Sequence, residues 1–258
     1  MARNPPTHDL GPPLPDLSVV IPVYNEEENL SLLWEELRGV LERLGVAFEV
    51  VFVDDGSRDR SAELIRAFRD ADSRVRLVRL KLNAGETAAT DAGFKAARGR
   101  WVVTMDADLQ NDPADIPLLL GHLDRWDAVS GWRVKRSAGD SIVRRISSRV
   151  ANGIRNAISD ESVQDSGCTF RAFRRECLRG LTLYRGFHRF IPTLLRMRGY
   201  RVLEVPVNHR PRRFGQSKYG IMNRAVVAFV DLVAVRWMKA RLLHYEVAEN
   251  VGGDVLHE

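Results

Sequence analysis

The stretch LSVVIPVYNEEEN (Leu17–Asn29) joins a nearly continuous apolar run to a cluster of polar residues. Leu17–Val23 is rich in β-branched side chains, which is typical of a strand covered on both faces in a parallel sheet. We expect a helix to follow directly, with Asn25 as its N-cap, glutamates in its first turn and an end at Gly45. The stretch therefore predicts the first strand–helix unit of an α/β fold.

The alternation of strands and helices continues to about residue 130. The further strands that we expect are Phe48–Val53, a strand near the sheet edge at Val75–Leu80, Trp101–Met105 and Asp127–Gly131. The expected helices between them are Asp59–Asp70, Thr87–Arg98 and Pro113–Trp126. Short connections between alternating elements indicate a mostly parallel, Rossmann-like central sheet with helices on both faces.

The second half of the sequence is less regular. It predicts helices at Asp140–Ile158 and about Phe190–Arg198, and strands at Gln164–Phe173 and Tyr200–Val207. Neither a low-complexity linker nor an internal repeat separates it from the first half, so we expect one continuous domain.

The composition fits an intracellular α/β protein. The chain has 258 residues, of which 45% are hydrophobic and 28% charged, which is enough for a sizeable core. Cys168 and Cys177 are its two cysteines, and they imply no disulfide framework, so a reducing cytoplasmic setting is expected. Residues 1–16 are predicted to be a disordered lead and residues 244–258 a tail. No apolar run is long enough to cross a bilayer, since Ala225–Val235 is short and contains Asp231.

Positive charge is concentrated in the second half. The net charge is +5, but residues 133–213 hold 18 Arg and one Lys against six Asp or Glu, a balance of +13 that leaves −8 elsewhere. This asymmetry indicates an anionic partner, such as a nucleic acid, a phospholipid or a phosphorylated small molecule. An exposed basic surface without a ligand is the alternative.

Acidic residues follow two of the predicted strands. Asp54 and Asp55 end the second strand, while Asp106, Asp108 and Gln110 lie in VTMDADLQND after the fourth. Ligands of open α/β sheets bind at the carboxyl ends of the strands, and carboxylate and amide oxygens suit Mg²⁺ or Mn²⁺. A solvated turn is the alternative for an isolated DxD. The sequence contains no GxGxxG after the first strand and no Walker, HExxH, CxxC or GxSxG motif, so it does not support those types of site.

Six ordered segments resemble family 2 glycosyltransferases with the GT-A fold, and in particular the dolichyl-phosphate mannose synthase-like enzymes that act on polyprenyl phosphates. The resemblance covers roughly residues 17–243. It rests on PVYNEEEN (22–29), VDDGSRDRS (53–61), LNAGETAATDAGFKAARG (82–99), MDADLQNDP (105–113), DSGCTFRAFRRE (165–176) and LEVPVNHRPRRFGQSKYG (203–220). It implies a single GT-A domain over residues 17–220, with a nucleotide-sugar half at 17–130 and an acceptor half at 131–220.

The resemblance implies inverting, metal-dependent transfer of a sugar, with mannose or glucose expected first, from a GDP- or UDP-sugar to a polyprenyl phosphate. Donor-binding residues would be Pro22, Tyr24, Glu26, Asp54, Asp55, Asp106, Arg213 and Lys218. The metal ligands would be Asp106, Asp108 and Gln110, with Mg²⁺ or Mn²⁺ bound. Ala84 and Glu86 depart from the family, which often has a bulkier or basic residue there.

The acceptor phosphate would bind arginines, whose planar fork matches phosphate oxygens. By the same resemblance its ligands would be Arg133, Arg144, Arg145 and Ser148. The sequence does not decide whether Arg144 or Arg145 faces the acceptor. Asp108, Asp165 and Arg133 are the expected catalytic residues, with Asp165 either orienting the acceptor, assisting catalysis or capping a strand. His188 and His209 are expected to be structural, and Cys168 to pack in a strand.

At helical spacing, residues 221–243 have one broad apolar face, and the segment closes with Arg236, Trp237, Lys239 and Arg241. Such a segment suits an amphipathic helix at an anionic membrane surface, which predicts peripheral association with the cytoplasmic face. Packing on the domain or on a second subunit in a homodimer is the alternative.

Two other functions fit parts of the sequence. A family 2 glycosyltransferase could act on a sugar or glycan acceptor, and a binding module for nucleotide-sugars or nucleic acid would need no catalysis. The basic half contains few aromatic residues among its arginines, and without a metal the paired acids would repel phosphates. Nucleic acid is therefore not an expected partner.

Overall fold

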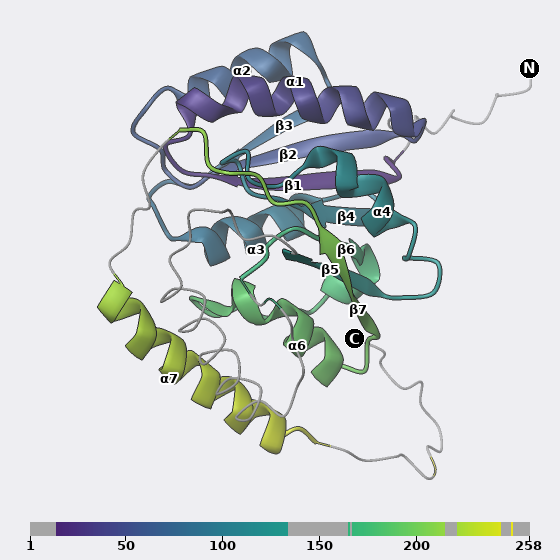
Figure 1. The fold of residues 1–258 in the computed structure, drawn as a ribbon, viewed down its shortest axis with the longest axis vertical. Coiled ribbons are helices and arrows are strands. Elements are labelled where there is room, and N and C mark those ends of the chain that lie inside the picture. The colour runs from purple at the N-terminus through teal and green to yellow at the C-terminus, as the bar shows by residue number, and fades with distance from the viewer. Residues whose placement is uncertain (1–13, 134–164, 166, 215–220, 244–248, 250–258) are drawn as a thin grey trace, which may run out of the picture.

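The computed structural model describes residues 14–133, 165, 167–214, 221–243 and 249. Its centre is a seven-stranded sheet with the order β3-β2-β1-β4-β6-β5-β7 (Figure 1). The strands are β1 (Leu17–Val23), β2 (Phe48–Asp54), β3 (Val75–Arg79), β4 (Trp101–Thr104), β5 (Ala128–Arg133), β6 (Arg171–Arg174) and β7 (Val202–Val207).

The sheet is mostly parallel, as the sequence predicts. β1 pairs in parallel with β2 and β4, β2 with β3, and β5 with β7. Only β6 runs the other way among these strands, antiparallel to both β4 and β5. The carboxyl ends of six strands therefore lie at one edge, where the loop that enters β6 also lies.

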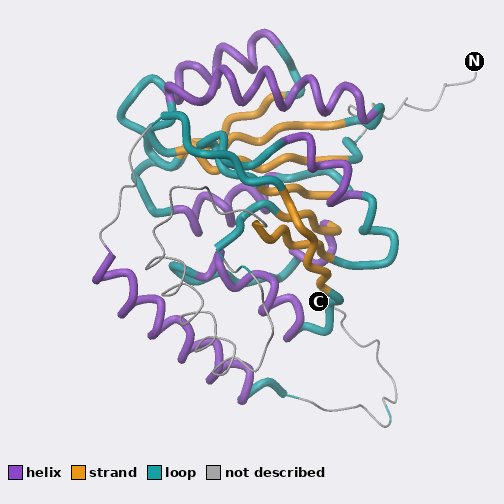
Figure 2. Tube along the Cα trace, in the orientation of Figure 1, coloured by secondary structure: helices purple, strands orange, loops and turns teal. Residues whose placement is uncertain are grey.

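Helices cover both faces of the sheet, as Figure 2 shows. They are α1 (Glu27–Leu44), α2 (Ser61–Ala71), α3 (Glu86–Ala96), α4 (Ile116–Leu120), α6 (Ile191–Met197) and α7 (Ile221–Ala240). Three 3₁₀ turns accompany them: η1 (Pro113–Asp115), η2 (Arg175–Leu178) and η3 (Phe187–Phe190).

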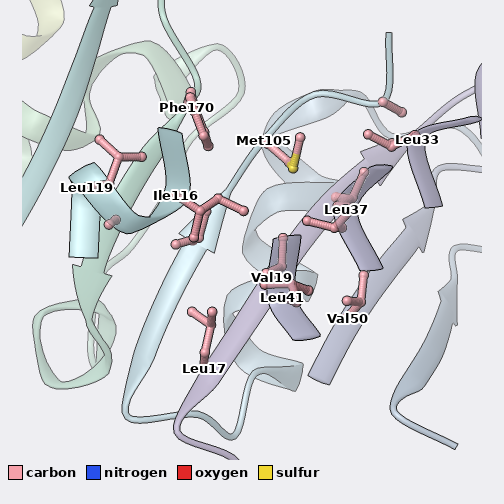
Figure 3. Close-up of a cluster of buried hydrophobic side chains, with 14 of the residues drawn as sticks. Leu17, Val19, Leu33, Leu37, Leu41, Val50, Met105, Ile116, Leu119 and Phe170 are labelled. Carbon is pink, nitrogen blue, oxygen red and sulfur yellow. The ribbon is translucent and has the colours of Figure 1, made fainter. Parts of the chain in front are cut away.

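The two faces have separate cores because alternate residues of a strand point to opposite sides. Val19 and Ile21 pack in the cluster that α1, α2 and α4 contribute to, whereas Val20 packs with α3 and α6. Figure 3 shows Leu33, Leu37 and Leu41 of α1 over the strands. Fully buried strand residues explain the continuous apolar runs in the sequence.

Three local predictions are wrong. Asn25 does not cap α1: it has φ 53°, its Oδ1 accepts from Arg58 N–H, and α1 begins at Glu27 with no side-chain cap. The predicted helix Pro113–Trp126 is only η1 and α4, which ends before Gly121, a poor helix residue. In the segment Gln164–Phe173, the described residues before Arg171 form a loop instead of a strand.

Cys168 is buried in this loop and not in a strand. The predicted helix Asp140–Ile158 lies outside the described residues, as do residues 1–13 of the lead and most of the tail. Gly45 ends α1 in the left-handed conformation, and β3 is an edge strand, as predicted.

No helix in the described part of the chain is long and apolar enough to span a membrane. α7 lies along one side of the molecule, away from the sheet (Figure 1). Its Asp231, Leu232 and Val235 are buried, and the two apolar ones pack with Phe187 and Leu194.

Candidate active site at the carboxyl edge of the sheet

The ends of β1 and β2 bring together five of the predicted donor-binding residues: Pro22, Tyr24, Glu26, Asp54 and Asp55. Pro22 is in register with Val53, and Asp55 N–H donates to the Val23 carbonyl at 2.8 Å, so Tyr24 follows beside the acid pair. Glu26 accepts from Asn29 Nδ2 at 2.7 Å. It lines a cavity of about 370 Å³ whose other walls are Asn25, Glu27, Glu28, Asn29, Arg58 and Asp59.

Asp54 and Asp55 each have protein partners that offset their charge. Asp54 is fully buried and accepts from Arg79 Nε and Ser57 N–H, both at 2.9 Å. Asp55 accepts from Asn83 Nδ2, Ala84 N–H and Gly85 N–H at 2.7–2.9 Å. These donors therefore offset the repulsion between the two adjacent acids.

The Asp55 contacts fix the loop before α3. Gly56 has φ 71°, and a Cβ there would lie 2.7 Å from the backbone nitrogen of Asn83. The close approach of these two loops therefore requires glycine. It sets Glu86, the first residue of α3, at the edge of the site.

Asp106 lies just beyond the end of β4. Its Oδ2 accepts from Thr169 Oγ1 at 2.6 Å, and its backbone N–H donates to Asn111 Oδ1 at 2.8 Å. Burial raises the pKa of Asp106 to about 7, and the nearby carboxylates of Glu86 and Asp108 add to the rise. A cation bound at this point would stabilise the ionised form.

Asp108 is held by a residue that the sequence prediction missed. Its Oδ2 accepts from Arg212 Nη2 at 2.6 Å, and its Oδ1 accepts from Gln110 N–H at 3.1 Å. The Gln110 side chain extends toward the chain after β7, where its Nε2 donates to the Arg210 carbonyl at 3.3 Å and lies 3.4 Å from His209 Nε2. Leu109 between them has φ 63°, which turns the chain.

Arg133 and Asp165 form an ion pair. Arg133 ends β5, and its Nε and Nη2 donate to the two carboxylate oxygens of Asp165 at 2.6 and 2.8 Å. Both are largely buried, with 21% and 7% of their side chains exposed. The two residues are 32 positions apart in sequence, and the antiparallel strand β6 brings the loop of Asp165 to the end of β5.

A buried polar layer lies beneath the acids, and sequence reasoning did not find it. Arg171 on β6 is 2% exposed, and its Nη1 donates to the His188 carbonyl at 2.6 Å. The His188 ring contacts Thr87 Oγ1 through Nδ1 at 2.7 Å and lies 3.5 Å from Glu86 through Nε2. Burial lowers the pKa of His188 to about 3, with Arg189 and Arg171 adding to the effect, so the ring is neutral.

The remaining predicted residues are not part of this geometry. Arg213 is exposed beside Arg212. Arg144, Arg145, Ser148 and Lys218 lie outside the described residues. The missed contacts of Thr169 and Arg212 come from the motifs DSGCTFRAFRRE and RPRRFG, which sequence reasoning had connected with the site through Asp165 and Arg213.

The mostly parallel sheet, with acids gathered at its carboxyl edge and an antiparallel strand beside β4, defines the GT-A class of α/β domains. The family model described as glycosyl transferase family 2 matches residues 18–182. The chain therefore belongs to glycosyl transferase family 2, a family of enzymes that transfer sugars.

Named relatives agree with this assignment. The chain is 40% identical over 218 residues to an undecaprenyl-phosphate 4-deoxy-4-formamido-L-arabinose transferase of Edwardsiella ictaluri, covering 84% of this chain and 66% of the relative. It is 39% identical over 222 residues to the Salmonella paratyphi A protein of that name, covering 86% and 67%. The chain thus spans about two thirds of these relatives' length.

Solved structures of glucosyl-3-phosphoglycerate synthase from Mycobacterium tuberculosis share the fold. One in complex with phosphoglyceric acid has a TM-score of 0.65 at 20% identity, covering 89% of this chain and 81% of the other. Another, in complex with Mn²⁺, uridine diphosphate and phosphoglyceric acid, has a TM-score of 0.65 at 21% identity, covering 89% and 80%.

Proposed function

We propose that this chain transfers a sugar from a nucleotide-sugar to a polyprenyl phosphate, with inversion at the anomeric carbon and with Mg²⁺ or Mn²⁺ bound. The observation that carries the proposal is the juxtaposition of two oppositely charged centres. Asp106 lies beyond the end of β4 and Arg133 ends β5, the two strands that flank β6. The loop before β6 contacts both, since Thr169 donates to Asp106 at 2.6 Å and Asp165 pairs with Arg133 at 2.6 Å. A donor diphosphate held through a cation on the acids would then lie beside an acceptor phosphate on the arginine.

The donor set fits a hard divalent cation. Asp106 and Asp108 offer carboxylate oxygens, and Gln110 an amide oxygen. Two carboxylates suit a cation that also takes substrate phosphate oxygens as ligands. When bound, the cation would offset negative charge on the leaving diphosphate.

The protein would bind the donor at the ends of β1 and β2. We assign Pro22, Tyr24 and Glu26 to the nucleotide, together with the Asp54–Asp55 turn. Arg212 donates to Asp108, and we assign it to the diphosphate, together with Arg213 and Lys218, which follow it in the sequence.

The acceptor phosphate needs little general-base assistance. A phosphate monoester has a second pKa of about 6, so it is mostly a dianion at neutral pH and already nucleophilic. It does need cations that remain charged when water is excluded, a property of arginine. We assign Arg133 to the acceptor phosphate. The further phosphate ligands that we propose, from the sequence alone, are Arg144, Arg145 and Ser148.

The outer face of α7 supports a membrane-surface location for the acceptor side. Its exposed apolar side chains are Val227, Phe229, Val230, Val233 and Trp237. Arg236, Lys239 and Arg241 follow at the end of the helix, where anionic headgroups would attract them. We propose that this face lies in the membrane interface, and a homodimer contact is the alternative outcome.

The name of the relatives supports a polyprenyl-phosphate acceptor more directly than a particular sugar. Their name gives 4-deoxy-4-formamido-L-arabinose as the sugar, whereas the family resemblance implied mannose or glucose first. The nucleotide and sugar are therefore the first targets of the test.

The test is a transfer assay with undecaprenyl phosphate and a panel of UDP- and GDP-linked hexoses and aminopentoses, each with and without Mn²⁺ or Mg²⁺. We expect a lipid-linked sugar and free nucleoside diphosphate only when donor, lipid phosphate and metal are all present. Asp106→Ala and Asp108→Ala should each abolish turnover, whereas Asp70→Ala, at an exposed ion pair on α2, should not. Transfer to a free sugar or glycan instead would overturn the acceptor assignment, and metal-independent turnover would overturn the metal site.

A further inference from the structure

The carboxylate of Asp165 is saturated with hydrogen-bond donors. Its Oδ2 accepts from Arg133 Nε at 2.6 Å and from Arg133 N–H at 3.3 Å. Its Oδ1 accepts from Arg133 Nη2 at 2.8 Å and from Gly167 N–H at 3.2 Å. Both carboxylate oxygens of Asp165 are therefore engaged by N–H donors, two of them on the Arg133 guanidinium.

The same contacts fix the orientation of the Arg133 guanidinium. Nε and Nη2 form one edge of the planar fork, and both are used by Asp165. A guanidinium has five N–H donors, and Asp165 uses one on Nε and one on Nη2. The edge formed by Nη1 and the second N–H of Nη2 therefore keeps the geometry that binds phosphate oxygens in pairs. Because Arg133 is the last residue of β5, its backbone is held by pairing with Val207 of β7.

Gly167 lets the loop approach this pair closely. A Cβ at Gly167 would lie 3.0 Å from Arg133 Nη2 and 3.5 Å from Asp165 Oδ1. The preceding strand is equally close, since a Cβ at Gly131 would lie 2.9 Å from the Phe170 carbonyl. The arginine therefore occupies a tight slot built by the β5 end and the loop before β6.

We infer that Asp165 is a positioning residue that aims the Arg133 guanidinium at the acceptor phosphate, and that it does not remove a proton. The inference rests on the proposed function. In the transfer step an acceptor phosphate oxygen forms a bond to the anomeric carbon while the bond from that carbon to the donor diphosphate breaks. The electron pair leaves with the diphosphate, and since the attacking oxygen of the dianion carries no proton, the step balances without a base.

Steady-state kinetics of Asp165→Asn with undecaprenyl phosphate, between pH 6 and 9, test this assignment. An amide keeps one acceptor oxygen but loses the charge, so we expect the KM for the acceptor to rise by about tenfold or more. We also expect kcat and the donor KM to change by less than about threefold, because the acids that hold the donor keep their contacts. The pH profile should keep the wild-type shape.

Two further variants separate positioning from folding. Gly167→Ala alters the slot without removing the carboxylate, and it should also raise the acceptor KM while the pH profile is retained. Asp70→Asn breaks an exposed Arg–Asp pair on α2 and should match wild type in all parameters. Thermal unfolding of each variant shows that the protein measured is folded.

The results distinguish this inference from the proposed function. Absence of wild-type transfer to undecaprenyl phosphate would reject the proposed acceptor, and the variants would then be compared on whichever phosphorylated acceptor is used. A fall in kcat of about a thousandfold for Asp165→Asn, with an unchanged acceptor KM and loss of the acidic limb of the pH profile, would identify Asp165 as a base and overturn the inference.

Discussion

Arg212 Nη2 lies 2.6 Å from Asp108 Oδ2, so a guanidinium neutralises one of the two acids that we propose as metal ligands. The pair joins the chain after β7 to the turn after β4, 104 residues earlier. In the protein without ligands, the arginine and a divalent cation would compete for the same carboxylate.

Arg212→Met should therefore change metal binding and donor binding in opposite directions. Because about one third of the Arg212 side chain is exposed, the pair is solvent-screened, and we expect Mn²⁺ affinity without nucleotide to rise by only about two- to fivefold. The stabilisation of the variant by a nucleotide-sugar should be smaller than in wild type. Mn²⁺ titration followed by electron paramagnetic resonance measures the first effect, with Arg69→Met as an exposed control. Weaker Mn²⁺ binding in Arg212→Met would contradict this competition.

Gly56→Ala should destabilise the protein strongly. The residue has φ 71°, and the new Cβ would meet the backbone of Leu82 and Asn83 at 2.7–2.8 Å, so the loop held by Asp55 must move. We expect the free energy of unfolding to fall by at least about 2 kcal/mol. Gly39→Ala, inside α1 with only Arg43 Nη1 nearby at 3.5 Å, should raise it by about 0.5–1 kcal/mol. Denaturant unfolding compares the two, and equal effects would show that the close approach is not required.

His188 should make stability fall in mild acid. Its pKa is about 3 in the folded protein, because of burial, against about 6.5 when unfolded, so between these values only the unfolded state binds a proton. Stability is then highest above pH 6.5 and is lost as the pH falls, by about 2 kcal/mol at pH 5 from this group alone.

The matched variants are His188→Asn and His122→Asn, compared by denaturant unfolding at several pH values. Replacing His188 should lower stability at pH 7.5, because the ring contact with Thr87 changes, and should flatten the dependence between pH 7.5 and 5. Replacing His122, which lies in the turns after α4, should leave the slope intact. An unchanged slope in His188→Asn would show that another group titrates.

Trp237→Ser should weaken binding to vesicles. The side chain is 63% exposed on the apolar face of α7, and removing it from the interface loses about 1.5–3 kcal/mol, roughly 10- to 100-fold in affinity. Sedimentation with anionic and with neutral phospholipid vesicles measures this, and Trp237→Phe should retain most binding. If the wild-type protein does not bind vesicles and sediments as a dimer in analytical ultracentrifugation, the apolar face of α7 is a contact between two copies instead.

The sequence predicts the sheet well because its strands are buried on both faces. Leu17–Val23 and Phe48–Val53 are apolar apart from Ser18 and Glu49, and their position in the sheet follows from the alternation with helices. Asn25 shows where local rules fail. Its side chain bonds to the loop after β2, 33 residues away, and this tertiary contact replaces the cap that local preference favours.

The candidate site was predictable only in part, for a similar reason. Asp106 and Asp108 are adjacent to a strand end, so their location follows from the fold class. Their partners Thr169 and Arg212 lie 63 and 104 residues away and depend on the pairing of β6 and on the path after β7. The count of charges located the basic region of the sequence, but it could not show that Arg212, and not its neighbour Arg213, contacts Asp108.

The antiparallel insertion of β6 between β4 and β5 also has a consequence for biosynthesis. β4 pairs with a strand that is made about 70 residues later, and Asp106 receives its hydrogen bond from the loop before that strand. A nascent chain that has emerged only to β5 can form the nucleotide half but leaves one side of β4 unpaired. The unpaired edge of β4 would be covered only when β6 pairs with it, which is a late, non-local step in folding. Because that step also brings Thr169 to Asp106, the donor and acceptor sites would be completed together and not in succession.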